Sequence, residues 1–175
     1  MGVDGSTYGD HVLMRRLQAC GAAEIVSFCP EAHTLGVPRP WCDIADGNGF
    51  DVLDGRARVR SETGEDVTAA FIEGARAMAA FAAQARADLA ILMDISAACG
   101  SQVIYRGART LETPERQASQ GVAAAALIRA GLPVMSQRDF ASLKRLFGVL
   151  GLDWTGPEDA RDHHESDWYR EAFAR

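Results

Sequence analysis

Two short apolar runs, each followed by a cysteine, constrain the fold of this chain more than any other feature. Residues 24–28 lead directly into Cys29, and residues 89–93 lead within a few positions to Cys99. Short apolar runs of this kind are typical of buried strands. Parallel α/β sheets bind ligands beyond the carboxyl ends of their strands. If the two runs form neighbouring strands, we expect both thiols to open into one crevice.

Helix and strand signals alternate along the rest of the chain. The apolar spacing predicts helices over 11–20, 66–87, 121–130 and 139–150, strands over 103–105 and 132–135, and a β-hairpin over 50–60. Residues 29–40 are expected to form a loop that is extended where Pro38 and Pro40 flank Arg39, and residues 108–117 are polar and expected to be mobile. This order predicts an α/β fold, a single three-layer α/β/α domain with a mainly parallel sheet and an inserted β-hairpin.

The chain length of 175 residues fits one domain with a sizeable core. We expect an α/β domain over residues 1–150 and an acidic C-terminal appendage over residues 151–175. The appendage contains His163 and His164 within a run of charged residues, which predicts a solvated surface rather than a metal site. We expect it either to dock through its aromatic side chains or to stay loose.

Composition excludes several classes of function. A net charge of −6 and a pI near 5.2 argue against a protein that binds the phosphate backbone of nucleic acids. No apolar run is long enough to span a membrane, and the first ten residues do not resemble a secretory signal. We therefore expect a cytoplasmic protein without nucleic-acid or membrane partners, whose four cysteines are reduced.

The residues around the two cysteines indicate a type of chemistry. Glu31 lies two positions after Cys29, and Ser96 lies three positions before Cys99. Two thiols beside a carboxylate and a hydroxyl suit a soft-metal or iron–sulfur centre with an acid/base group at its edge. Two cysteines alone are too few to hold such a cluster.

Seven short motifs follow one another in the order found in a known family. They are CPE at 29–31, GVPRP at 36–40, DGRARV at 54–59, GEDVT at 64–68, AIL at 90–92, SxxCGS at 96–101 and GVxAAxL at 121–127. In these motifs the chain resembles the thiouracil desulfurase family, over roughly residues 3–147.

The resemblance implies a small α/β enzyme that binds a [4Fe-4S] cluster through three cysteines. The fourth iron is open and takes sulfur from a small thiolated pyrimidine such as 2-thiouracil. By this resemblance Cys29 and Cys99 are two of the cluster ligands, and Glu31 and Ser96 lie near the open iron, where protons move and water is activated.

The chain departs from the family pattern in two places. The first cluster cysteine of the family belongs to a Cys-Leu-Leu-Gly element before an Arg-Tyr-Asp-Gly turn, and residues 3–5 match the end of that turn. We therefore expect this ligand either upstream of Met1 or lost in this protein. In the family a Ser-Pro-Ser-Cys sequence precedes the glycine, whereas here Ala97 and Ala98 replace its proline and second serine.

Several alternatives remain open at this level. Cys42 is a substitute ligand candidate, and with Cys29 and Cys99 it would form a zinc site. A relative with a decayed cluster site would be a non-catalytic binding or regulatory domain. Arg39 is expected to contact a substrate or to pin its loop by a salt bridge. Ser101 is either a donor to cluster sulfur or a turn cap, and His33 is either a proton carrier or a surface histidine. Cys20 is expected to be a core or surface thiol.

Overall fold

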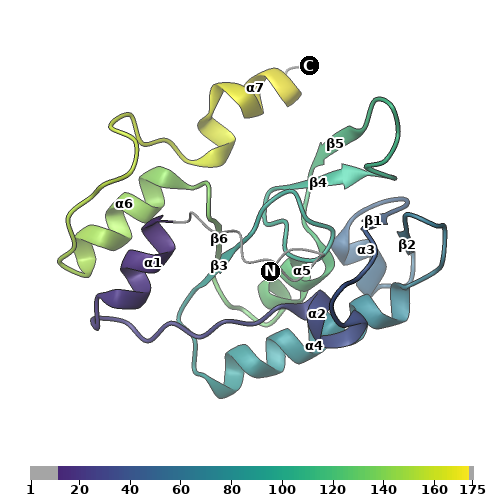
Figure 1. Cartoon of the computed structure of the whole chain (residues 1–175), viewed down its shortest axis with the longest axis horizontal. Helices are drawn as coiled ribbons and strands as arrows, with labels where there is room; N and C mark the ends of the chain where they lie inside the picture. The colour runs from purple at the N-terminus through teal and green to yellow at the C-terminus, as the bar shows by residue number, and fades with distance from the viewer. Residues whose placement is uncertain (1–11, 174–175) are drawn as a thin grey trace.

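Short strands and longer helices alternate in the computed structural model, which describes residues 12–173 (Figure 1). The helices are α1 Val12–Ala19, α2 Pro30–Leu35, α3 Gly49–Leu53, α4 Thr68–Gln84, α5 Val122–Arg129, α6 Phe140–Val149 and α7 Asp167–Phe173, with a 3-10 turn η1 at His163–Glu165. The strands are β1 Cys42–Ile44, β2 Val59–Ser61, β3 Ala90–Leu92, β4 Val103–Arg106, β5 Glu115–Ala118 and β6 Val134–Ser136.

The described strands pair in three two-stranded sheets. β3 and β6 run parallel, whereas β1 with β2 and β4 with β5 run antiparallel. The predicted α/β class with parallel strand pairing is confirmed. Within the described part of the chain, the expected single sheet is replaced by one parallel and two antiparallel pairs.

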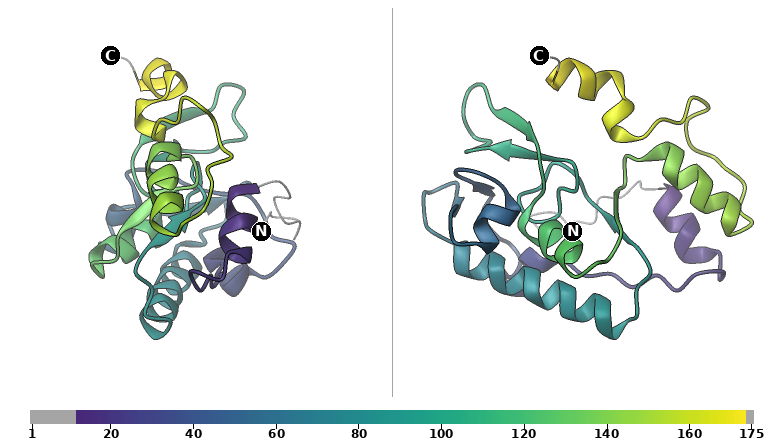
Figure 2. Two further views of the ribbon diagram at one scale, coloured as in Figure 1. Left: turned by 90° about the vertical axis from the view of Figure 1, so that its left-hand side faces the viewer. Right: turned by 180° about the vertical axis from the view of Figure 1, so that it is seen from behind.

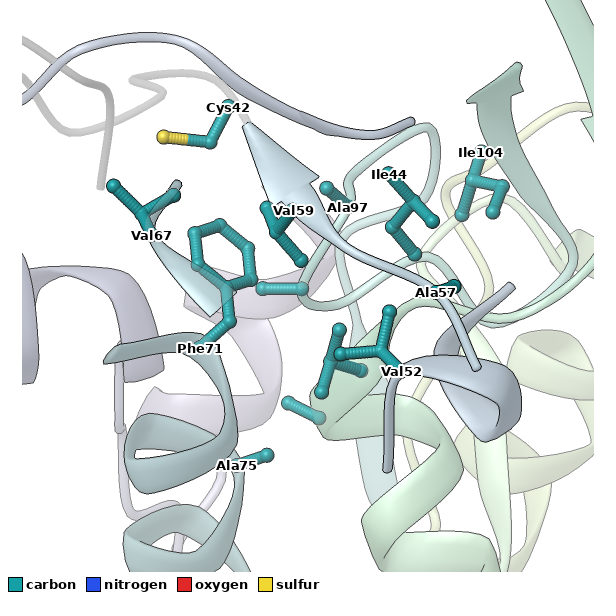
Figure 3. Close-up of a cluster of buried hydrophobic side chains, with 13 residues drawn as sticks. Cys42, Ile44, Val52, Ala57, Val59, Val67, Phe71, Ala75, Ala97 and Ile104 are labelled. Carbon is teal, nitrogen blue, oxygen red and sulfur yellow. The ribbon is translucent and has the colours of Figure 1, made fainter. Parts of the chain in front are cut away.

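The main core lies between α4, α5 and the β1–β2 sheet (Figure 3). Val52, Val59 and Ile104 are completely buried in it, and Cys42 lies at one end beside Val67. A smaller cluster around Leu92, Ala124 and Leu127 connects α5 to β3. Both clusters use the apolar face of α5, so this helix is fixed against both parts of the core.

Two predicted elements near the first cysteine are wrong. Residues 24–28 form no strand, and Ile25 and Val26 are 41% and 43% exposed, so this apolar run is not buried in a sheet. Residues 29–40 were expected to form a loop, but they contain α2. Pro30 starts this helix, where its fixed φ and missing N–H are tolerated.

The predicted hairpin over residues 50–60 is also wrong. Its first half is α3, because Asn48 and Asp51 form a capping box that starts a helix there. Its second half, β2, pairs with β1 instead. Part of the segment 108–117 is also ordered, since β5 begins at Glu115 and pairs with β4.

The segment after residue 150 packs against the rest of the described chain. Trp154 meets the ring of Phe147 in α6 edge-on, and Arg16 of α1 donates to the Asp153 carbonyl and the Thr155 hydroxyl. Figures 1 and 2 show α1 and α6 side by side in all views. Among residues 12–173, no helix combines the length and the apolar character needed to cross a membrane.

Candidate functional site

Cys29 is held at the start of α2. Its Sγ accepts a hydrogen bond from the Ala32 N–H at 3.5 Å and lies 3.7 Å from an Arg39 nitrogen. The helix lies directly on α4, because a Cβ added to Gly74 would be 2.5 Å from the Pro30 carbonyl oxygen. Glycine at position 74 therefore allows the close approach that places Cys29.

Cys99 lies in the turn that follows β3. The Ser96 Oγ accepts from the N–H groups of Ala98 and Cys99 at 3.3 and 3.1 Å, which folds the turn. Gly100 closes it, because a Cβ there would overlap the Val103 carbonyl oxygen. The serine found from the sequence thus shapes the backbone around the cysteine.

The first backbone N–H groups of α5 donate hydrogen bonds to this turn. Val122 and Ala123 donate to the carbonyls of Ala97 and Ala98, both at 2.9 Å. The first N–H groups of a helix have no partner within the helix, so they are available for this contact. Ala97 and Ala98 are 2% and 1% exposed. The turn is therefore fixed by α5 without the proline and second serine of the family pattern.

Glu31 connects the two cysteine-bearing segments. Arg39 Nε donates to Glu31 Oε2 at 3.0 Å, and Ser96 Oγ donates to Oε1 at 3.4 Å. The side chains of Arg39 and Glu31 are 3% and 17% exposed, so this ion pair is shielded from water. Of the two alternatives for Arg39, the structure contains the salt bridge.

The pKa of Cys99 depends on its burial and on charges nearby, including that of Cys29. Burial raises the pKa of Cys99 most, and the nearby charges of Glu31 and Cys29 raise it further. Without a metal Cys99 is therefore a neutral thiol, and a bound cation would have to displace its proton.

Cys42 is not part of a metal site in this structure. Its Sγ donates to the Pro40 carbonyl at 3.5 Å. Burial, followed by the charges of Glu31 and Asp43, raises the pKa of Cys42 to about 12. No group of three histidine, cysteine or acidic side chains within residues 12–173 is arranged to hold a metal ion. The alternative of a zinc site from Cys29, Cys42 and Cys99 therefore finds no support among these residues.

The thiols of Cys29 and Cys99 fit an iron–sulfur cluster in the chemistry of their ligand atoms. Cluster irons are bound by thiolates, and both cysteines lie beside the same carboxylate. They are two of the three ligands that the family resemblance leads us to expect. The third was expected either upstream of Met1 or lost in this protein, and residues 3–5, on which that expectation rests, lie outside the described residues.

The contacts of Ser101, Cys20 and His33 bear on the roles expected for them. Ser101 is 5% exposed, and its Oγ has no hydrogen-bond partner among the described residues. Cys20 donates to the Leu17 carbonyl at the end of α1, and His33 packs on Phe28. These contacts favour structural roles for Cys20 and His33.

The prediction that His163 lies on a solvated surface is wrong. It is 4% exposed, and its Nδ1 lies 2.8 Å from Asp94 Oδ2, whereas the adjacent His164 is exposed. The surrounding charges in the sequence hide this contact, because the partner lies 69 positions away.

Asp94 lies at the base of the turn that carries Cys99, and sequence reasoning missed it. Burial disfavours its charged form, but hydrogen bonds from His163, Val103 and Gln102 outweigh this effect and lower the pKa of Asp94. Ile95, next in the chain, has a φ of 58°, a conformation that costs a β-branched residue about 1–3 kcal/mol. An aspartate between apolar residues at a strand end was the available signal.

Comparison with known proteins gives three matches. A family model described as 2-thiouracil desulfurase matches residues 3–139. The uncharacterized protein YbbK of Bacillus subtilis (strain 168) is 33% identical over 140 residues, which are 79% of this chain and 91% of YbbK. The solved structure of the [4Fe-4S]-dependent thiouracil desulfidase TudS is 29% identical with a TM-score of 0.63, covering 84% of this chain and 89% of TudS. The resemblance inferred from the motifs is confirmed.

Proposed function

Because the chain belongs to the 2-thiouracil desulfurase family, we propose that it removes sulfur from a thiolated pyrimidine such as 2-thiouracil with the help of a [4Fe-4S] cluster. One observation carries the proposal. Glu31 accepts from Arg39 beside the Cys29 sulfur and from Ser96 in the turn of Cys99, so one shielded carboxylate joins the two cysteine-bearing segments, although 70 residues separate the cysteines in sequence.

The net reaction is a hydrolysis. Water adds at the thiocarbonyl carbon, the carbon–sulfur bond breaks, and the products are the oxo pyrimidine, hydrosulfide and a proton. The cluster, when bound, supplies a soft electrophile that accepts the sulfur. Cys29 and Cys99 would hold it.

Glu31 is the proton carrier of the proposed reaction. A carboxylate within hydrogen-bond reach of a water can take a proton as the water attacks carbon. Arg39 binds Oε2 of Glu31, and Ser96 binds Oε1, so both contacts fix the direction of the carboxylate. In this scheme the Ser96 hydroxyl gives up its 3.4 Å hydrogen bond to Glu31 and donates to water or substrate instead.

Anaerobic reconstitution with iron and sulfide tests the proposal. The 175-residue chain is compared with a version that carries a Cys-Leu-Leu-Gly element ahead of Val3. We expect visible absorbance, bound iron and hydrosulfide release from 2-thiouracil in the extended version.

Single substitutions in that version assign the ligands. Cys29→Ser and Cys99→Ser should abolish the visible absorbance, whereas Cys42→Ala, the matched control, should keep it. Colour and iron content that survive Cys99→Ser would contradict the ligand assignment. A colourless protein in all versions would instead favour a non-catalytic relative.

A further inference from the structure

We propose that His163 is a positioning residue for the cysteine-bearing turn and that it acts through Asp94. The inference deepens the proposed function, since the turn carries Ser96 and Cys99. His163 lies 24 residues after Asp139, at which the family match ends. A segment that the family match does not include thus reaches the proposed site.

The two carboxylate oxygens of Asp94 have separate partners. Oδ2 lies 2.8 Å from His163 Nδ1, and the exposed fractions of these two side chains are 0% and 4%. Oδ1 accepts from the backbone N–H groups of Ile95, Gln102 and Val103 at 3.1, 3.2 and 2.9 Å. One oxygen therefore binds the C-terminal segment and the other binds the turn.

The amides that Oδ1 binds come from both ends of the turn. Ile95 precedes Ser96, while Gln102 and Val103 follow Cys99. Asp94 therefore joins the two ends of the loop that contains the proposed ligand and hydroxyl. Rotation of its carboxylate would release both ends together, and the His163 contact opposes that rotation.

A second carboxylate reinforces the connection. Asp139 Oδ1 accepts from the His163 backbone N–H at 2.9 Å. Both oxygens of Asp139 also accept from Gln102 Nε2, at 2.7 and 2.8 Å. Gln102 is thus bound by Asp94 through its backbone and by Asp139 through its side chain. The same segment fixes both carboxylates.

Aromatic contacts orient the imidazole. The His163 ring stacks on Trp168 with a centroid distance of 5.1 Å, and Tyr169 meets it edge-on at 5.7 Å. His163 Nε2 is buried and has no hydrogen-bond partner among the described residues. The ring is therefore held by its Nδ1 contact and by α7.

Two substitutions at one position separate this hydrogen bond from packing. His163→Asn keeps an N–H near the position of Nδ1, whereas His163→Gln moves it toward the position of Nε2. Both remain polar and similar in size. His164→Gln makes the same chemical change at the exposed neighbour and is the matched control.

The first measurement is hydrogen exchange of the Ile95, Gln102 and Val103 amides in the full chain. In His163→Gln we expect exchange roughly tenfold faster, because the carboxylate that accepts these bonds is no longer fixed. Exchange in α4 should not change. His163→Asn and His164→Gln should match the unsubstituted chain.

The second measurement is hydrosulfide release by the reconstituted extended version. His163→Gln should lower kcat about tenfold with little effect on KM, and His163→Asn should restore it. Equal loop exchange in the Gln and Asn variants would overturn the inference, as would equally faster exchange in α4. The exchange result does not depend on turnover, so failure of the proposed function is a separate result.

Discussion

Arg39 makes two contacts in the site that depend on its shape. Its Nε binds Glu31, and its terminal nitrogen approaches the Cys29 sulfur at 3.7 Å. The guanidinium presents its donors in a fixed planar fork, so one side chain reaches both groups at once. A lysine ammonium has the same charge but cannot keep both directions.

Replacing Arg39 with lysine tests the importance of this geometry. We expect kcat for hydrosulfide release to fall roughly tenfold, the loss of one hydrogen bond to a charged group, while bound iron is retained. Arg145→Lys, a change at a largely exposed position in α6, is the control and should keep full activity. Equal activity of the two variants would show that charge alone is enough.

The raised pKa of Cys42 predicts how the free energy of unfolding changes at alkaline pH. Its pKa rises from 9.0 to about 12 on folding, so the native state keeps this proton after the unfolded chain has lost it. The contribution of this group to the free energy of unfolding is complete below pH 9 and decreases between pH 9 and about 12. At one pH unit above 9 the loss is about 1.4 kcal/mol.

Urea unfolding of the metal-free chain across this pH range checks the effect. Cys42→Ala should make the alkaline decrease smaller, leaving the part that comes from Cys99, whereas Cys20→Ala keeps both groups and should follow the original curve. The decrease would have another origin if both variants followed it equally.

At the scale of elements, two helical glycines have opposite surroundings. Gly74 in α4 faces the start of α2, and a Cβ there would be 2.5 Å from the Pro30 carbonyl oxygen. Gly148 in α6 is exposed, and its Cβ would meet no atom within 4 Å. Alanine ordinarily stabilises a helix relative to glycine, so the two positions separate packing from helix propensity.

We expect Gly148→Ala to raise the free energy of unfolding by about 0.5–1 kcal/mol, and Gly74→Ala to lower it by about 1–3 kcal/mol. Displacement of α2 should also weaken cluster binding in Gly74→Ala. Urea unfolding and bound iron after reconstitution measure the two effects. A stabilising Gly74→Ala would show that α2 moves away at no cost.

Elements with long or strongly periodic patterns could be predicted from the sequence. α4, α5 and α6 were found, as was the parallel partner strand β6, because their apolar spacing or their flanking glycines mark them. The hairpin over residues 50–60 failed because its apolar residues also fit one helical turn. The capping box at Asn48 decided between the two.

The candidate site was predictable only where chemistry follows a local motif. Cys29, Glu31, Ser96 and Cys99 were predicted this way, and the structure brings their segments together through Arg39, Glu31 and Ser96. The apolar run before Cys29 failed as a strand signal because tertiary packing, which determines burial, is absent from periodicity. The His163–Asp94 contact was missed because it joins residues 69 positions apart without any spacing rule.

At the scale of the whole molecule, the C-terminal segment lies beyond the family match and contacts three parts of the described chain. It contacts α1 through Arg16, the start of α6 through Asp162, and the cysteine-bearing turn through His163. Asp162 accepts from both the backbone N–H and the hydroxyl of Ser142, each at 2.7 Å. A distant carboxylate therefore caps the first turn of α6.

Removal of this cap tests whether the segment stabilises the whole fold. We expect Asp162→Ala to lower the free energy of unfolding by about 1–2 kcal/mol, the usual cost of losing a helix cap. Asp159→Ala, at a side chain that is 77% exposed, should leave stability close to that of the unsubstituted chain.

The measurement is urea unfolding followed by both tryptophan fluorescence and far-ultraviolet circular dichroism. If the segment is part of one cooperative unit, the two signals shift together in Asp162→Ala, because Trp154 and Trp168 lie in the segment while most helices lie outside it. An earlier transition by fluorescence alone would mean that the segment unfolds separately. His163 would then leave Asp94 while the remaining helices are still folded.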